Sequence, residues 1–279
     1  MRQKIIELNG VTSILGKTNV GLYDGCLVDT AVIDVPLDLV AIIITHGHAD
    51  HFTWARRIQK RTGAPVIAPR QDAPLIEDPE INVRGMFNWA RPPVEMTTKL
   101  FIGDACEVDY YVEDHRFSDT ITPIPLPGHT MGQTGYLCDG VLFSGDALYP
   151  EAVWTQYKLP YSIDVELTRR SLDTIQNTVF DWLVPGHGPP MSKEESDEQI
   201  ALHRGRLAEI DDMIKRILRG PRSTEEVIYS VLKELDIEDS LAQYWLSVTT
   251  IKGHLSGLVS TYKVAYETTD HRVYWKLRE

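Results

Sequence analysis

Three histidines and an aspartate fall within seven consecutive residues, Thr-His-Gly-His-Ala-Asp-His at positions 45–51. An apolar run rich in β-branched residues, 40–44, comes directly before this stretch and predicts a buried strand that ends in a loop. Neutral imidazole is the commonest protein ligand for zinc-like ions, and a carboxylate adds an oxygen donor. We therefore predict that the stretch binds metal through His46, His48, Asp50 and His51.

Three later segments each carry another histidine or aspartate beside glycine. They read Gly128-His129-Thr130, Ser144-Gly145-Asp146 and Pro185-Gly186-His187-Gly188. In order and in residue type, these segments and the 45–51 stretch resemble the signature of the metallo-β-lactamase superfamily, and in particular its glyoxalase II-like and endoribonuclease-like branch. The glycines would let the backbone of each loop approach bound ions closely.

The resemblance implies a site for two divalent metal ions. It assigns the first ion to His46, His48 and His129, the second ion to Asp50, His51 and His187, and a bridging position to Asp146. Zinc is the first expectation for this donor set, with iron and manganese as alternatives, because affinity order alone does not decide which metal a cell supplies. One branch of the superfamily holds a single iron and oxidises persulfides, but it lacks the second ligand group that is present here.

The function implied by the resemblance is that of a dinuclear metal-dependent hydrolase. A metal-bound hydroxide would cleave a small ester, thioester or lactone, since two ions about 3.5–4 Å apart can hold both the attacking and the leaving oxygen. Asp50 is a candidate for returning a proton to the leaving group, beside the bridging Asp146. Tyr149 and Tyr161 are candidates for donating a hydrogen bond to the oxyanion, although tyrosines at a core edge are commonly structural.

The expected fold class is α/β, with a four-layer αββα metallo-β-lactamase sandwich over residues 1–200. Turn signals and apolar runs predict strands at 11–15, 18–23, 26–29, 66–68, 107–112, 121–125, 135–138, 141–144 and 182–184. Helices are expected at 52–61 and through Leu167, Leu172, Ile175 and Val179. The family has a full helix before the metal strand, but 32–38 is short and contains Pro36, so that this helix is expected to be lost.

A second domain is expected over residues 201–279. A long helix at 194–219 ends at Gly220-Pro221, and further helices are predicted from Ser223, at 241–245 and at 249–259. Two alternating stretches, 263–268 and 272–277, then predict a hairpin. Helices followed by a hairpin resemble the winged helix-turn-helix domain that some members of the superfamily carry.

Charge disfavours a nucleic-acid partner. The net charge is −12, and residues 201–279 balance 12 basic against 12 acidic side chains, so that the whole excess of negative charge lies in the first 200 residues. The predicted recognition segment, 249–261, carries only Lys252 as a fixed positive charge, whereas nucleic-acid readers cluster arginine and lysine there. A single-strand endoribonuclease and a DNA-binding regulator with a metal-sensing domain therefore remain as alternatives, and the tail could instead form a lid or a homodimer surface.

Cysteine usage and hydropathy predict a cytoplasmic protein. The three cysteines, Cys26, Cys106 and Cys138, are widely spaced and form no Cys-x-x-Cys pair, which is typical of buried thiols in a reducing compartment. The sequence contains no apolar run of the roughly 20 residues that a membrane helix needs, and its first residues lack a signal-peptide core.

The stretch 70–98 mixes aromatic residues, arginines and helix breakers, and it has no clear periodicity. Insertions at this point of the superfamily fold tend to border the mouth of the active site. Phe87, Trp89 and Arg91 are therefore candidates for the substrate pocket, and packing against the outside of the domain is an equally good interpretation.

Overall fold

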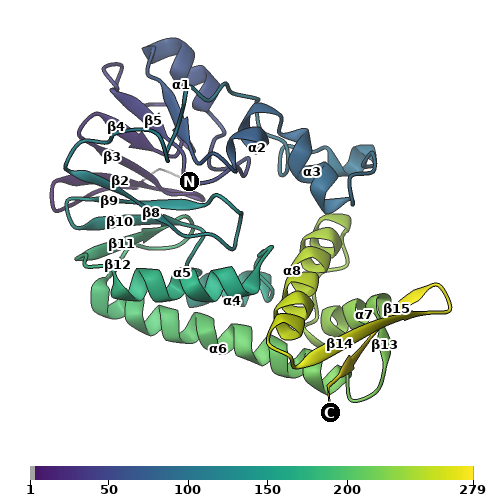
Figure 1. The fold of residues 1–279 in the computed structure, drawn as a ribbon. Helices are drawn as coiled ribbons and strands as arrows, with labels where there is room; N and C mark the ends of the chain where they lie inside the picture. The colour runs from purple at the N-terminus through teal and green to yellow at the C-terminus, as the bar shows by residue number, and fades with distance from the viewer. Residues whose placement is uncertain (1–3, 279) are drawn as a thin grey trace.

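The computed structural model describes residues 4–278, which form two face-to-face β-sheets with helices on their outer sides (Figure 1). The first sheet has seven strands in the order β1-β2-β3-β4-β5-β6-β7. They are β1 (Lys4–Leu8), β2 (Val11–Leu15), β3 (Val20–Tyr23), β4 (Cys26–Val28), β5 (Ala41–Ile43), β6 (Val66–Ala68) and β7 (Tyr110–Tyr111). Strand β5 lies between two parallel neighbours and is buried throughout, as expected for the apolar run that precedes the histidines.

The second sheet has five strands in the order β12-β11-β10-β9-β8. They are β8 (Ile121–Pro125), β9 (Thr134–Cys138), β10 (Val141–Gly145), β11 (Trp182–Pro185) and β12 (Met191–Ser192). Because β10 and β11 pair parallel, the loops that follow them leave the sheet at the same edge. The Tyr136 hydroxyl of this sheet donates a hydrogen bond to the Ile44 carbonyl, 2.9 Å away, directly before the histidine-rich stretch. The two sheets are thereby fixed to each other next to the predicted ligands.

The outer layers are helical. Helix α1 (Ala55–Thr62) packs on the first sheet, and α5 (Val165–Asn177) and α6 (Lys193–Ile217) cover the second, with α4 (Glu151–Tyr157) beside them (Figure 1). Each helix buries one apolar stripe against its sheet: α1 contributes Ile58, and α5 contributes Leu172 and Ile175. The order helix, sheet, sheet, helix agrees with the expected α/β class and αββα layers.

The C-terminal part is built from α7 (Thr224–Glu234), α8 (Leu241–Ser260) and a three-stranded sheet of β13 (Arg222–Ser223), β15 (Arg272–Leu277) and β14 (Val264–Thr269). The expectation of two helices at 241–245 and 249–259 was wrong, because α8 is continuous. A buried stripe at Val248, Ile251, Leu255 and Leu258 extends over the last three turns, and this tertiary burial stabilises the unbroken helix.

Other boundaries also differ from the expectation. The irregular stretch 70–98 contains α2 (Ala73–Glu77), α3 (Glu80–Met86) and the 3₁₀ turn η1 (Val94–Met96). Ile76 of α2 joins the core of the first sheet, whereas α3 and η1 pack in a small core that residues of α8 complete. Only residues 110–111 of the expected strand at 107–112 pair in the sheet, and Val179 lies beyond α5 with 89% of its surface exposed. Strand β1 and helix α4 were not predicted. Residues 32–38 contain no helix, as expected.

All three cysteines are buried free thiols. Within residues 4–278, no helix combines the length and the apolar character needed to cross a membrane.

The N-terminus of α6 gives a first prediction. The Ser192 hydroxyl accepts a hydrogen bond from the Glu195 backbone N–H, and the Glu195 carboxylate accepts one from the Ser192 N–H. Ser192→Ala removes half of this capping box, so that we expect the free energy of unfolding to fall by about 1 kcal/mol in urea denaturation. Ser230→Ala, which removes an exposed hydroxyl that bonds only within α7, should change it much less.

Candidate metal centre

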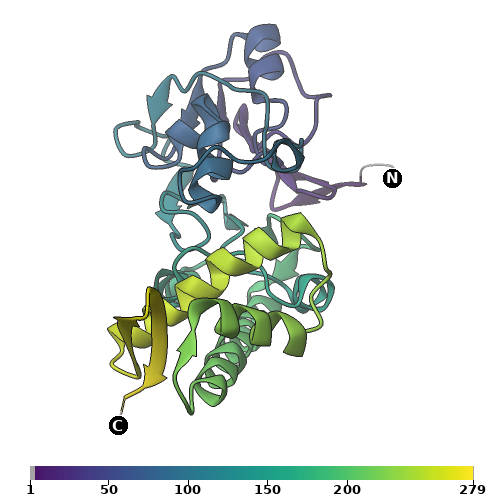
Figure 2. The same cartoon turned by 90° about the vertical axis from the view of Figure 1, so that its right-hand side faces the viewer.

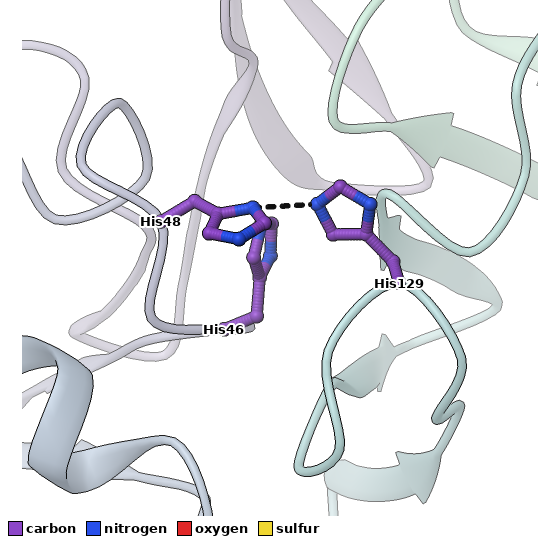
Figure 3. Close-up of side chains that lie close together, drawn as sticks. All are labelled: His46, His48 and His129. Carbon is purple, nitrogen blue, oxygen red and sulfur yellow. Dashed lines mark hydrogen bonds between the residues drawn. The ribbon is translucent and has the colours of Figure 1, made fainter. Parts of the chain in front are cut away.

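Side chains from distant parts of the sequence meet where the loops after β5, β8, β10 and β11 come together. The first group is formed by His46 and His48 from the loop after β5 and His129 from the loop between β8 and β9 (Figure 3). The Nδ1 atom of His48 lies 2.7 Å from Nε2 of His129, and one nitrogen from each ring lies within 4.8 Å of the others. Zinc–nitrogen bonds are about 2.0–2.1 Å long, so this spacing suits one shared cation.

A second group lies beside the first. One donor atom from each of Asp50, His51 and His187 lies within 4.8 Å of the others. Asp146 stands between the two groups: its Oδ1 atom is 3.4 Å from His51 Nε2, and its Oδ2 atom is 3.4 Å from His187 Nε2 and 3.5 Å from His129 Nε2. The structure therefore brings together all seven residues singled out as ligands in the sequence.

Three donor atoms of this cluster are buried and have no hydrogen-bond partner among residues 4–278. They are His46 Nε2, His51 Nε2 and Asp146 Oδ1. Such atoms are rare, because a buried polar atom without a partner costs about 1–3 kcal/mol. A cation placed among them would complete their coordination, so the residues present fit the divalent metal ions that the donor set implies.

In four of the histidine rings, the nitrogen that faces away from the centre already has a hydrogen-bond partner. The Nδ1 atoms contact Thr45 Oγ1 at 3.1 Å (His46), Asp29 Oδ2 at 2.7 Å (His51), the Tyr161 carbonyl at 3.0 Å (His129) and the Lys17 carbonyl at 2.6 Å (His187). A proton on Nδ1 leaves Nε2 free, and such partners fix both the tautomer and the direction of a metal-binding imidazole.

Charge is distributed unequally over the two groups. Burial and the neighbouring imidazoles lower the pKa of His46 well below its ordinary value, and burial together with His129 lowers the pKa of His48 to about 3. For His51, burial acts in the same direction, but Asp50, Asp29 and Asp146 outweigh it and raise the pKa well above the ordinary value. The first group is therefore neutral and ready to bind a cation, whereas the three carboxylates around His51 favour positive charge in the second group, as they would favour a cation bound there.

Asp72 joins two of the ligand-bearing loops. This buried carboxylate accepts hydrogen bonds from the Gly47 N–H (2.8 Å), the Thr130 hydroxyl (2.6 Å) and the Gly132 N–H (2.7 Å). Gly47 lies between His46 and His48, and Thr130 follows His129. Sequence reasoning missed Asp72, because an aspartate in a loop gives no sign of which distant backbone groups it will meet.

The β2–β3 turn supports the second group and was missed as well. The Thr18 hydroxyl donates to Asp50 Oδ2 (2.8 Å), and the Lys17 carbonyl contacts His187. The Asn19 side-chain amide donates to the carbonyls of Pro185 and Gly188, both at 2.8 Å, on either side of His187.

The two tyrosines lie next to His129. The Tyr149 hydroxyl is 2.7 Å from His129 Nδ1 and 3.4 Å from Asp146 Oδ2, and burial together with Asp146 raises its pKa well above the ordinary value, so that the hydroxyl keeps its proton. The ring centre of Tyr161 lies 5.4 Å from that of His48 and 5.5 Å from that of His129. Both tyrosines border the centre, and their expected role as oxyanion donors stays a prediction.

The residues proposed for the substrate pocket lie in different environments. Phe87 packs edge-on against Trp245 of α8, with ring centres 4.9 Å apart, whereas Trp89 is 71% exposed. Arg91 lines a surface cavity of about 750 Å³ together with Glu80 and Arg84. The structure of residues 4–278 shows no hydrogen bond or ring contact between this trio and the seven clustered donors, and their role in substrate binding stays a prediction.

Asp72 allows a direct test of how the loops are held. Every contact to its carboxylate comes from a donor, so that Asp72→Asn turns an amide N–H toward another donor. We expect the affinity of the apoprotein for Zn²⁺ or Co²⁺ to fall about 10–100-fold in titration calorimetry or chelator competition. Asp104→Asn makes the same charge change at an exposed site and serves as the control. Equal metal affinity in the two variants would contradict the positioning role of Asp72.

Comparison with known proteins finds a matching family model and several relatives of part of the chain. The family model described as the metallo-beta-lactamase superfamily matches residues 35–187. Hydroxyacylglutathione hydrolases from Methylobacillus flagellatus and Vibrio cholerae are 29% and 32% identical over 113 and 114 residues, 40% of this chain in each case. These stretches cover only 35% and 34% of the relatives, so that the chain matches about a third of their length. A probable metallo-hydrolase from Streptococcus pyogenes is 29% identical over 163 residues, 54% of this chain and 65% of the relative.

Solved structures show the same fold. A beta-lactamase domain protein from Burkholderia ambifaria superposes with a TM-score of 0.70 at 16% identity and covers 98% of this chain and 93% of that chain. A metallo-beta-lactamase family protein from Thermus thermophilus has a TM-score of 0.65 at 18% identity, with 96% of this chain and 94% of that chain covered. With a family model that spans more than half of the sequence and a donor cluster inside the matched range, the chain belongs to the metallo-β-lactamase superfamily.

Proposed function

We propose that the protein is a dinuclear metal-dependent hydrolase that cleaves a small thioester, ester or lactone. The observation that carries this proposal is the position of Asp146, whose two carboxylate oxygens face the His51 side and the His129 side of the centre respectively. His46, His48 and His129 would hold one ion, Asp50, His51 and His187 the other, and Asp146 both. Zinc is the first choice for this donor set, with iron and manganese as alternatives.

When bound, the ions would polarise the scissile carbonyl and lower the pKa of water toward about 7. The chain supplies the remaining functions. Asp50 is the most exposed ligand, with half of its side chain accessible, so that its carboxylate can take up a proton and pass it to the leaving atom. The protonated Tyr149 hydroxyl can donate either to Asp146 or to the oxygen of a bound carbonyl, because it lies within reach of the centre.

A thioester is the preferred substrate class. The two similar proteins from M. flagellatus and V. cholerae are named hydroxyacylglutathione hydrolases, and the bond between an acyl group and glutathione is a thioester. This similarity supports a thioester as the substrate of this chain. The part of this chain that the family model matches contains the complete set of candidate ligands. The residues outside that match would determine which acyl group and which thiol the substrate carries. Lactones and simple esters pass through the same tetrahedral oxyanion, and they form the rest of the test panel.

We further propose that residues 1–200 form the catalytic domain and that residues 201–279 form a winged-helix-like domain. The order α6 end, β13, α7, α8 and the β14–β15 hairpin supports the second assignment. A nucleic-acid partner is disfavoured because α8, which would be the reading helix, buries much of its surface in the protein. This observation counts against both the endoribonuclease and the DNA-binding regulator.

Removal of the metal ligands tests the proposed function. We expect purified protein to contain about two metal ions per chain and to hydrolyse a thioester, and Asp146→Asn and His129→Ala to lose metal and at least about 100-fold in kcat/KM. His271→Asn, at the exposed turn between β14 and β15, should behave as the unmodified protein. Cleavage of single-stranded RNA that depends on Asp146, without turnover of any small substrate, would instead favour the endoribonuclease.

Tyr149→Phe tests the contribution of a single hydroxyl. The variant keeps the buried ring but removes the donor near Asp146 and the partner of His129. We expect kcat to fall roughly 10- to 100-fold while the metal content stays close to two per chain. Steady-state kinetics and metal analysis on the same sample separate the two quantities. An unchanged kcat would show that Tyr149 is structural.

A further inference from the structure

Helix α8 belongs to the C-terminal part of the chain, yet it extends along the catalytic body. Its N-terminal end lies beside α3 and its C-terminal end leads into the β14–β15 hairpin (Figure 2). Trp245 and Leu246 of α8 pack in the same small core as Tyr161 and residues of the 83–102 stretch. The middle of α8 lies against the connection between α4 and α5, which contains residues 158–164.

That connection holds the His129 loop. The Gly128 carbonyl, one residue before His129, accepts hydrogen bonds from the Ser162 hydroxyl (3.1 Å) and from the backbone N–H groups of Ile163 (2.9 Å) and Asp164 (3.1 Å). Gly128 has φ = +134°, and a Cβ atom there would lie 2.4 Å from the Thr168 backbone nitrogen. The His129 loop therefore packs closely against the connection and against Thr168 of α5, so that its position depends on the position of both.

The same connection sets the direction of the His129 ring. The Tyr161 carbonyl lies 3.0 Å from His129 Nδ1, where it shares the ring proton with the Tyr149 hydroxyl at 2.7 Å and leaves Nε2 directed at the metal centre. A backbone carbonyl cannot rotate by itself, so that its direction depends on how residues 161–163 are held. The His129 imidazole is thus oriented by the peptide group between residues 161 and 162, and that peptide group is itself held by another part of the chain.

Helix α8 provides that support. The buried Thr250 hydroxyl accepts a hydrogen bond from the Ser162 N–H (3.1 Å) and directs its own proton to the Leu246 carbonyl (3.3 Å). One turn further, a Cβ atom on Gly253 would lie 3.2 Å from the Ile163 carbonyl oxygen, which shows how closely the two backbones approach. Thr250 therefore holds the Ser162 N–H by a hydrogen bond, and Gly253 allows α8 to pack directly against the Ile163 carbonyl.

A charged network holds α8 in place behind this contact. Asp211 of α6 contacts the Arg169 guanidinium of α5 at 2.6 Å through Oδ2 and the His254 ring of α8 at 2.7 Å through Oδ1. The His254 side chain is fully buried, and the aspartate and arginine side chains are 19% and 25% exposed. Three helices are joined by one carboxylate, so that α8 cannot shift along the catalytic body without breaking these bonds.

We propose that α8 is a positioning element of the metal centre and that Thr250 is its positioning residue. Through the Ser162 N–H, Thr250 holds residues 161–163 so that the Tyr161 carbonyl orients His129 as a ligand. The C-terminal part of the chain then acts on the site from within the same molecule, without touching metal or substrate. This inference rests on the proposed metal-binding function of His129.

The test compares Thr250→Val with two variants of the same helix. Valine keeps the size of threonine but leaves the buried Ser162 N–H without an acceptor, whereas Thr250→Ser restores the hydroxyl. Ser247→Ala is the matched control, because the Ser247 hydroxyl is buried in α8 and has no partner among the described residues. Each apoprotein is titrated with Co²⁺, and the affinity, the stoichiometry and the visible absorption of the bound ion are recorded together with Tm.

We expect Thr250→Val to bind Co²⁺ about 3- to 10-fold more weakly and to change its absorption spectrum, because such outer partners tune the ligands they hold. Thr250→Ser and Ser247→Ala should match the unmodified protein. A Thr250→Val protein with unchanged affinity and spectrum would overturn the proposal, as would a weakening of equal size in Ser247→Ala.

A second variant covers the case in which Thr250→Val does not fold. Gly253→Ala pushes α8 away from the Ile163 carbonyl by a few tenths of an ångström and keeps every hydrogen-bonding side chain. It should likewise weaken Co²⁺ binding and alter the spectrum, and an unchanged spectrum in this folded variant would contradict the proposal. Failure of the unmodified protein to bind Co²⁺ would refute the proposed metal function itself, which is a separate outcome.

Discussion

The structure depends on holding polar donor atoms in a largely buried site, where several of them make no hydrogen bond. The ring nitrogens of His46 and His51 that face the centre, and one oxygen of Asp146, are buried without a hydrogen bond in the part of the chain that the structure describes. Each such atom lowers the stability of the fold, because its hydrogen bonds to water are lost on burial and not replaced. The fold tolerates this cost only where packing prevents the side chain from rotating toward another partner. A cation would recover this loss, so that metal binding and the stability of the site are coupled.

Most candidate ligands are oriented by a hydrogen-bond partner on the side that faces away from the metal centre. Asp29 and Thr45 hold the histidines after β5, Asp72 ties that loop to the His129 loop, and the β2–β3 turn holds Asp50 and His187. Two of these contacts, those of the Gly47 N–H and the Lys17 carbonyl, involve backbone groups, which move only with the elements that carry them. The precision of the centre is therefore a property of the two sheets and their loops as a whole.

Helix α8 extends this principle to the C-terminal part of the chain. A reading helix would have to present a free, basic face to nucleic acid. In this protein the helix instead carries glycines where it meets the catalytic body and a buried hydroxyl that bonds across the boundary. Its buried His254 imidazole is linked to Arg169 of α5 through Asp211. These features favour a supporting role for α8 inside the molecule. Such a role needs no basic side chains, which agrees with the single lysine in 249–261.

The sequence by itself indicated the candidate ligands and, through the family resemblance, the four layers. Imidazole and carboxylate have few other uses at such density after a buried strand, and the alternation of β-branched runs with turns located the strands around them. Local pattern also predicted the loss of a helix at 32–38, because Pro36 and the shortness of the segment act locally.

Tertiary structure alone decided the continuity of α8, the small core under 83–102 and the partners of the ligands. The residues around Ser247 have no strong local preference, and burial of a stripe through Val248 and Ile251 makes the helix unbroken. Asp72 and Thr250 act on groups 25 to 88 residues away in the sequence, such as the Gly47 and Ser162 N–H groups. A hydrogen bond of that kind depends on where two backbones meet in space, and no local pattern of residues encodes it.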